Sequence, residues 1–235
     1  MIMGCNTRLG VVSGLRKEVD LLNIGKREPG VIAKVTGGRP KLAKQYSSDL
    51  IAEQCSALLS FGVAGGLSPD LRCGDVIIGD SVLRLNAKSI PTCEEWRLKL
   101  LSSLKGLDKI FVGPILGVDT LIGTSNQKLA LYKKTSGLAV DMESYYVGKV
   151  AQEFDLPFLV IRVILDPVDF NIPSSATDVI DELGVPKYKL ILSNLLKSPN
   201  ELPKLMNLSQ SLNIATSKLA KLNSLVGPYF CLMGD

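Results

Sequence analysis

The chain has 235 residues, of which 46% are hydrophobic and 21% charged, and it contains no histidine. This size suits one globular domain, and no apolar run reaches the roughly 20 residues that cross a bilayer. Without histidine there can be no Ser-His-Asp triad, Cys-His pair or imidazole metal site, so a general acid must be Asp, Glu, Lys, Tyr or Cys. The first five residues lack the pattern of a secretory signal, and we expect a cytoplasmic protein.

The net charge of +4 is concentrated in the last quarter of the chain. Between residues 183 and 235 there are six lysines and two acidic residues, so the rest of the chain is neutral. Lysines without arginines or interleaved aromatics are a poor nucleic-acid signature, so we expect no nucleic-acid partner; a membrane surface or a solvated face fits better. The five cysteines show no C-x-x-C spacing, and we expect neither a metal site nor a cofactor.

Strand and helix patterns alternate along most of the chain. Continuous apolar runs indicate parallel strands that are covered on both faces. The sequence therefore predicts an α/β fold, a three-layer α/β/α sandwich with a central mixed, mostly parallel sheet, as one domain over 1–235. The expected strands are 9–14, 31–35, 57–61, 75–78, 81–83, 109–112, 138–140 and 156–165, and the expected helices are 15–22, 41–55, 96–104, 125–134 and 143–154.

A helical extension is expected at about 185–227. Its apolar residues recur at helical spacing between 205 and 226, and Ser, Asn and Lys occupy the other faces. Such a stripe is typical of a helix packed on its own domain. The alternative is a surface that contacts a partner or a membrane.

Glycine clusters follow two expected strands, at 37–38 and 62–66. Neither has the spacing of a phosphate loop or a dinucleotide site, so each can be a simple turn or a place where the backbone approaches a ligand. Arg39 after the first cluster is either a surface residue or an anion ligand. Glu18 on the first helix would ordinarily be solvated.

Two carboxylates are more informative. Asp166 directly follows an eight-residue, mainly apolar run, where exposure to solvent is unexpected, and Asp is seldom buried without a partner or a task. Helix capping is the alternative explanation for Asp166. Glu143 begins an expected helix after a short strand, so both carboxylates lie at the sheet edge where α/β proteins bind ligands.

In this order and spacing, these motifs resemble the superfamily of purine nucleoside phosphorylases and methylthioadenosine/adenosylhomocysteine nucleosidases. The resemblance extends from about residue 9 to 169. Within the superfamily, the segments 15–18, 61–66 and 113–119 and the C-terminal extension are most similar to the hopanoid-associated phosphorylase branch. The motifs are Ser60–Leu67, Gly74–Ile78, Ala139–Ser144 and Leu156–Asp166.

The resemblance implies cleavage of an N-glycosidic bond. Asp166 would protonate the leaving base, as a carboxylic acid kept neutral by burial away from cations. Glu143 would bind the ribose hydroxyls, and Met142 would pack on the sugar. Leu121 and Ile122 align with the base-contacting segment, where an aromatic residue is common. Further substrate-binding residues would be Asp141, Val63, Ala64 and Gly65; Val63 stands where many members have Ser or Thr.

The nucleophile is left open by these residues. Glu18 aligns with the residue that activates water in the nucleosidases. Phosphorylases instead need donors for phosphate, and the expected ones are Gly14, Arg16, Gly37 and Arg39. The branch resemblance favours phosphate as co-substrate.

The resemblance thus predicts a phosphorylase acting on an adenine nucleoside with a 5′ modification like that of adenosylhopane. A hydrolytic nucleosidase and a noncatalytic nucleoside-binding protein are the alternatives. By analogy with the superfamily we also expect a homo-oligomer, and the basic tail suggests peripheral contact with a membrane.

Overall fold

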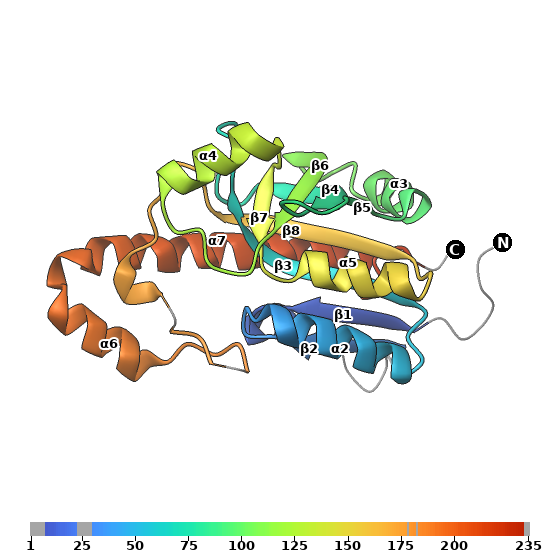
Figure 1. Ribbon diagram of the computed structural model, residues 1–235, viewed down its shortest axis with the longest axis horizontal. Helices are drawn as coiled ribbons and strands as arrows, with labels where there is room; N and C mark the ends of the chain where they lie inside the picture. Colours follow the sequence, from blue (N-terminus) through green and yellow to red (C-terminus); the bar gives the residue numbers. More distant parts are fainter. Residues whose placement is uncertain (1–7, 23–29, 178, 182, 233–235) are drawn as a thin grey trace.

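The computed structural model describes residues 8–22, 30–177, 179–181 and 183–232. It is an α/β/α sandwich around one eight-stranded mixed sheet, as the sequence predicts (Figure 1). The strands are β1 Leu9–Ser13, β2 Val31–Val35, β3 Ala57–Gly66, β4 Val76–Leu83, β5 Ile90–Pro91, β6 Ile110–Gly117, β7 Ala139–Asp141 and β8 Phe158–Asp166. The helices are α1 Arg16–Asp20, α2 Pro40–Ala52, α3 Glu94–Ser103, α4 Ser125–Thr135, α5 Ser144–Glu153, α6 Tyr188–Lys197 and α7 Leu202–Val226, with short 3₁₀ turns η1 Ser174–Ala176 and η2 Pro199–Glu201.

Five of the strands close into a ring. β3 pairs with β8, β8 with β4, β4 with β6, β6 with β7, and β7 returns to β3. The pairs β3–β8, β4–β6 and β6–β7 are parallel, and β4–β8 and β3–β7 are antiparallel. β1 and β2 extend the sheet in parallel beyond β3. The ring brings the ends of β3, β7 and β8 together although they are far apart in sequence.

Helices cover both faces of the sheet. On one face, Leu50 of α2 and Val147 of α5 pack into an apolar cluster with the even-numbered side chains of β8, such as Val160. On the other face, Trp96 of α3 and Leu219 of α7 pack with odd-numbered side chains of β8, such as Ile161. The mainly apolar sequence of β8 follows from this double coverage.

The expected strands are confirmed with three differences, of which the first is that the short strand β5 was not predicted. The glycine-rich segment 62–66 is not a loop after β3 but its second half, because Gly65 and Gly66 pair with β7. The two short strands expected at 75–78 and 81–83 are one strand, β4, whose pairing with β6 shifts register between Gly79 and Val82. A register irregularity accounts for the apparent interruption.

The C-terminal extension consists of α6, η2 and α7. In Figure 1, α7 runs along the sheet and α6 stands away from it. Ala215, Leu219 and Leu222 of α7 are buried in the core, as expected of a helix packed on its own domain. No helix of the described chain combines the length and apolar character needed to cross a membrane.

Candidate functional site

A cavity of about 180 Å³ opens where β3, β7 and β8 end. Its wall carries three predicted carboxylates, Glu18, Glu143 and Asp166, and they come from three separate parts of the chain. All three are buried, with at most 6% of each residue exposed. The topology therefore places the acidic residues together in a site that is sheltered from water.

Glu18 projects from α1 and is held by backbone amides. Its Oε2 accepts a hydrogen bond from the N–H of Leu15 at 2.8 Å, and its Oε1 accepts one from the N–H of Val63 at 2.8 Å. Burial raises the pKa of Glu18, and these amides and the Arg162 charge oppose the rise. A carboxylate with a raised pKa and fixed geometry is suited to accept a proton.

Gly62 is needed for this arrangement. A Cβ atom at position 62 would lie 2.6 Å from Oε1 of Glu18, well inside van der Waals contact. The glycine of β3 thus serves close approach to a buried side chain.

Glu143 lies at the start of α5, across Gly14 from Glu18. A Cβ at Gly14 would be 3.1 Å from Oε1 of Glu143 and 3.8 Å from Oε2 of Glu18. The hydroxyl of Thr36 donates to Oε1 of Glu143 at 3.3 Å. Burial raises the pKa of Glu143 to about 7; the Arg162 charge opposes this rise, and the charges of Asp141 and Glu18 add to it. This carboxyl therefore changes its protonation near neutral pH.

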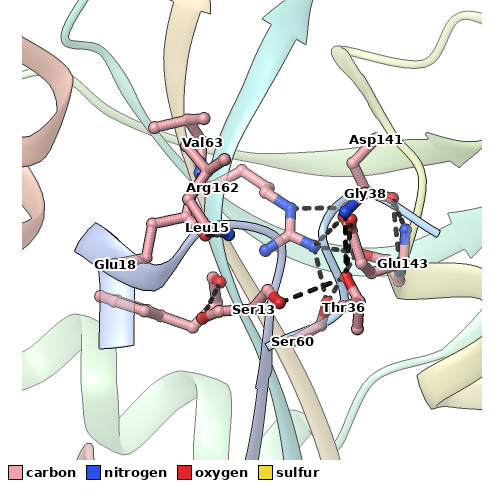
Figure 2. A network of polar contacts seen from close by, with 12 residues as sticks. Ser13, Leu15, Glu18, Thr36, Gly38, Ser60, Val63, Asp141, Glu143 and Arg162 are labelled. Atoms are coloured by element: carbon pink, nitrogen blue, oxygen red, sulfur yellow. Dashed lines mark hydrogen bonds and ion pairs between the residues drawn. The ribbon is translucent and has the colours of Figure 1, made fainter. Parts of the chain in front are cut away.

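Arg162 in the middle of β8 directs its guanidinium group toward Asp141 and Glu143 (Figure 2). It is 1% exposed; its Nε donates to Asp141 at 2.6 Å, and its Nη2 donates to Ser60 at 2.7 Å and Ser144 at 3.1 Å. Nη2 also lies 3.6 Å from Oε2 of Glu143. A buried arginine needs such a set of acceptors to offset its desolvation.

Asp141 completes the network. One of its oxygens accepts from the backbone N–H groups of Glu143 and Ser144, and the other contacts Arg162 and the hydroxyl of Ser144. Asp141 lines the cavity, but its carboxylate is already engaged within the protein. Its geometry is that of a support for the start of α5.

Asp166 ends β8 on the other side of the cavity, beside Gly65. The expectation that it is buried away from cations is wrong, because the ammonium group of Lys128 lies 2.6 Å from its Oδ2. Burial raises the pKa of Asp166 and Lys128 opposes the rise. No helix begins at Asp166, so capping does not explain its position.

The remaining wall is apolar. Val63, Ala64 and Gly65 of β3 line the cavity together with Leu121, Ile122 and Met142. Leu121 is 46% exposed, which places it at the rim. These residues form a slot that suits a flat heterocyclic base.

Three of the four expected phosphate ligands do not line the cavity; Gly14 does. Arg16 lies two residues from the buried Glu18 and so on the opposite side of α1, where its side chain is 60% exposed and lies 3.9 Å from Asp20. Arg39 donates to the carbonyl oxygens of Gly37 and Asp181, the latter at 2.8 Å. Gly37 is packed against the side chain of Arg39 and the carbonyl oxygen of Asp181.

Two residues of the site, Lys128 and Arg162, were not predicted. Residues three positions apart on a helix share a face, and Leu131 of α4 packs against the core. The spacing of Lys128 from Leu131 was therefore the signal that this lysine points inward. Arg162 interrupts the apolar run of β8, a position at which a charge must find partners. Within the described ranges, no group of three or more Cys, Asp or Glu side chains could hold a metal ion.

Known proteins are similar to this chain in sequence or in structure. The 5′-methylthioadenosine/S-adenosylhomocysteine nucleosidase of Mycobacterium bovis is 26% identical over 198 residues, which is 64% of this chain and 78% of that protein. Among solved structures, the nucleosidase of the same name from Helicobacter pylori matches with a TM-score of 0.70 at 17% identity, covering 95% of this chain and 99% of that one. Futalosine hydrolase of Helicobacter pylori matches with a TM-score of 0.70 at 16% identity, covering 93% and 96%. These structures share the fold.

The family model described as "Phosphorylase superfamily" matches residues 29–184. The match contains β2 to β8, and with them Glu143, Asp166 and the glycine-rich half of β3. Because it spans more than half of the chain, this protein belongs to the phosphorylase superfamily.

Proposed function

We propose that the protein is a nucleosidase that hydrolyses the N-glycosidic bond of an adenine nucleoside. The observation that carries the proposal is the set of three buried carboxylates, Glu18, Glu143 and Asp166, around one apolar slot. The names of the similar nucleosidases support the substrate class. The apolar rim at Leu121 and Ile122 supports a nucleoside whose 5′ substituent is apolar, such as a thioether or the hopane group that the sequence suggests.

The charges around the cavity favour water over phosphate as nucleophile. Among the described residues that line it, Arg162 is the only cation, and Asp141 already neutralises it. A phosphate dianion would have to approach Glu18 and Glu143 without a free positive charge. Water carries no such penalty, and Glu18 can accept its proton.

The proposed reaction uses each carboxylate differently. Asp166 gives its proton to N7 of the base, while the C1′–N9 bond breaks and its electron pair passes to the base. Glu143 accepts hydrogen bonds from the ribose hydroxyls as the sugar becomes oxocarbenium-like. Water adds to C1′ and its proton passes to Glu18. General acid catalysis of this kind contributes about 10²- to 10⁴-fold to the rate.

The test is adenine release from adenosine, methylthioadenosine, adenosylhomocysteine and adenosylhopane, each with and without inorganic phosphate. We expect turnover without phosphate, with an unphosphorylated sugar as the second product: ribose from adenosine, and ribose that keeps its 5′ substituent from the other three nucleosides. Asp166→Asn should abolish adenine release, and Asp169→Asn, an exposed carboxylate three residues on, is the matched control. Full activity of Asp166→Asn would refute the mechanism, and saturable nucleoside binding without base release would favour a binding protein.

Phosphorolysis is the second candidate, and one observation favours it. Gly14, Gly38 and Gly65 line the cavity, and backbone amides at glycines are common donors to oxyanions. Strict dependence on phosphate with ribose 1-phosphate as product would select phosphorolysis.

Oligomer formation and membrane contact remain proposals. Four apolar side chains on the described surface of the C-terminal extension are exposed, and such a surface fits either self-association or membrane contact. They are Leu192, Leu196, Leu202 and Met206. Sedimentation velocity tests self-association, and flotation with anionic vesicles tests membrane contact.

A further inference from the structure

Lys128 on α4 is a fully buried lysine beside the proposed acid. Its relative exposure is 0%, and its ammonium nitrogen lies 2.6 Å from Oδ2 of Asp166. Buried lysines are rare because desolvation of the charge is costly. The mechanism proposed above does not use Lys128, so its presence needs another explanation.

The hydrogen bonds of Lys128 are all committed to the backbone. Nζ donates to the carbonyl oxygens of Asp166 at 3.2 Å, Pro167 at 2.9 Å and Phe170 at 2.9 Å. An ammonium group has three protons, so none remains for the carboxylate. Accordingly, Oδ2 of Asp166 has no aligned hydrogen-bond donor among the described residues despite its close approach to Nζ. Lys128 thus acts on Asp166 chiefly through its charge.

The surroundings of Asp166 leave Lys128 as its dominant charged neighbour. Burial raises the pKa of Asp166, and Lys128 is the charged group that opposes this rise. Cys73 precedes β4 by three residues; burial raises the pKa of its thiol, and the charge of Asp166 adds to that rise. Glu18, Glu143 and Arg162 line the same cavity as Asp166.

We propose that Lys128 is a positioning residue for the acid: its charge sets the pH range in which Asp166 holds a proton, and its three hydrogen bonds fix the turn 166–170. The inference deepens the proposed function, because it takes Asp166 as the residue that protonates the base. Removal of a charge at this distance shifts a carboxyl titration by about 1 to 3 pH units.

The first test is the pH dependence of kcat for Lys128→Met. Asp166 must be protonated to act, so activity is lost as pH rises through its pKa. Without the ammonium group, burial acts unopposed, and the basic limb of the profile should move to higher pH by about 1 to 3 units. Lys128→Arg should keep the limb near the wild-type position. Lys133→Met, an exposed lysine on the same helix, is the matched control and should leave the profile unchanged.

A purely structural role predicts a different result. In that case kcat of Lys128→Met would fall by the same factor at every pH, with both limbs in place. That outcome overturns the proposal.

The second test does not depend on activity. The side-chain carboxyl of Asp166 is titrated by ¹³C NMR in wild type and Lys128→Met, with Asp166→Asn to assign its resonance. An upward shift in the variant supports the proposal, and an unchanged titration refutes it. If the wild type releases no base, the proposed function fails while this titration still reports whether Lys128 controls Asp166.

Lys128→Met can also destabilise the protein, because it leaves Asp166 buried without its counter-ion. The double variant Lys128→Met/Asp166→Asn then separates the effects. It should be more resistant to urea than Lys128→Met, since it removes the unpaired charge as well. A double variant that is no more resistant than Lys128→Met would show that the two side chains are not coupled, and would refute the proposal.

Discussion

Replacing Glu143 by Gln is expected to remove activity and yet stabilise the protein at alkaline pH. Glu143 has a pKa of about 7 in the folded protein and 4.5 as its ordinary value, so ionisation disfavours the folded state. One pKa unit corresponds to about 1.4 kcal/mol. Because the pKa is higher in the folded protein, ionisation of Glu143 lowers the free energy of unfolding. This loss is small below pH 4.5, grows between pH 4.5 and 7, and is complete above pH 7.

The magnitude follows from proton linkage with these two values. Ionisation of Glu143 costs about 1 kcal/mol of unfolding free energy at pH 5 and about 3 kcal/mol at pH 8. Glutamine cannot ionise, so the stability of Glu143→Gln relative to wild type should be higher at pH 8 than at pH 5 by about 2 kcal/mol. Comparing the two pH values cancels effects of the substitution that do not depend on pH, such as altered contact with Thr36.

Urea unfolding at both pH values measures this difference. The chain has a single tryptophan, Trp96, which is buried against α7 and reports unfolding by fluorescence. Glu153→Gln, an exposed glutamate at the end of the same helix, controls for the loss of one negative charge. An equal stability change of Glu143→Gln at pH 5 and pH 8 would refute the reasoning.

Three further substitutions test the rest of the site. Glu18→Gln should lower kcat by about 10²- to 10⁴-fold and remove the acidic limb of the pH–rate profile, because activity rises as Glu18 loses its proton. Arg162→Met should lower the unfolding free energy by about 3 to 5 kcal/mol in urea titrations, since Asp141 is left buried and unpaired; Asp141→Asn in the same protein should recover part of it. Gly62→Ala should displace Glu18 and lower kcat by about 10²-fold in steady-state assays, and Gly106→Ala, which faces open space, should not.

The sequence was sufficient to single out the two carboxylates, because Glu143 and Asp166 both follow apolar strands and strand ends are where α/β proteins bind ligands. Their proximity could not be inferred from the order of elements, because β8 runs parallel to β3 whereas β7 runs antiparallel to it. The ring of strands is what brings them to one cavity. The structure adds that β3 continues through its glycines, which brings Gly62 and Gly65 against the carboxylates.

The partners of these carboxylates could not be predicted in the same way. Lys128 and Arg162 are charged residues, and most such residues are solvated. Their roles depend on contacts between α4 and the turn after β8, and between β8 and β7, which no local pattern encodes. The helical period does predict the position of Arg16. Residues two positions apart on a helix point in different directions, so a buried Glu18 places Arg16 on the outer side of α1.

The pairing of β3 with β8 has a consequence for how this site can be altered. Ala64 pairs with Ile164 but Gly65 pairs with Asp166, so Leu165 is an extra residue in the ladder, and Leu165 and Asp166 both line the cavity. The location of the acid thus depends on the number of residues in the strand as well as on their identity. Shortening β8 by one residue before Asp166 would misplace the proposed acid while leaving every side chain of the candidate site in the sequence.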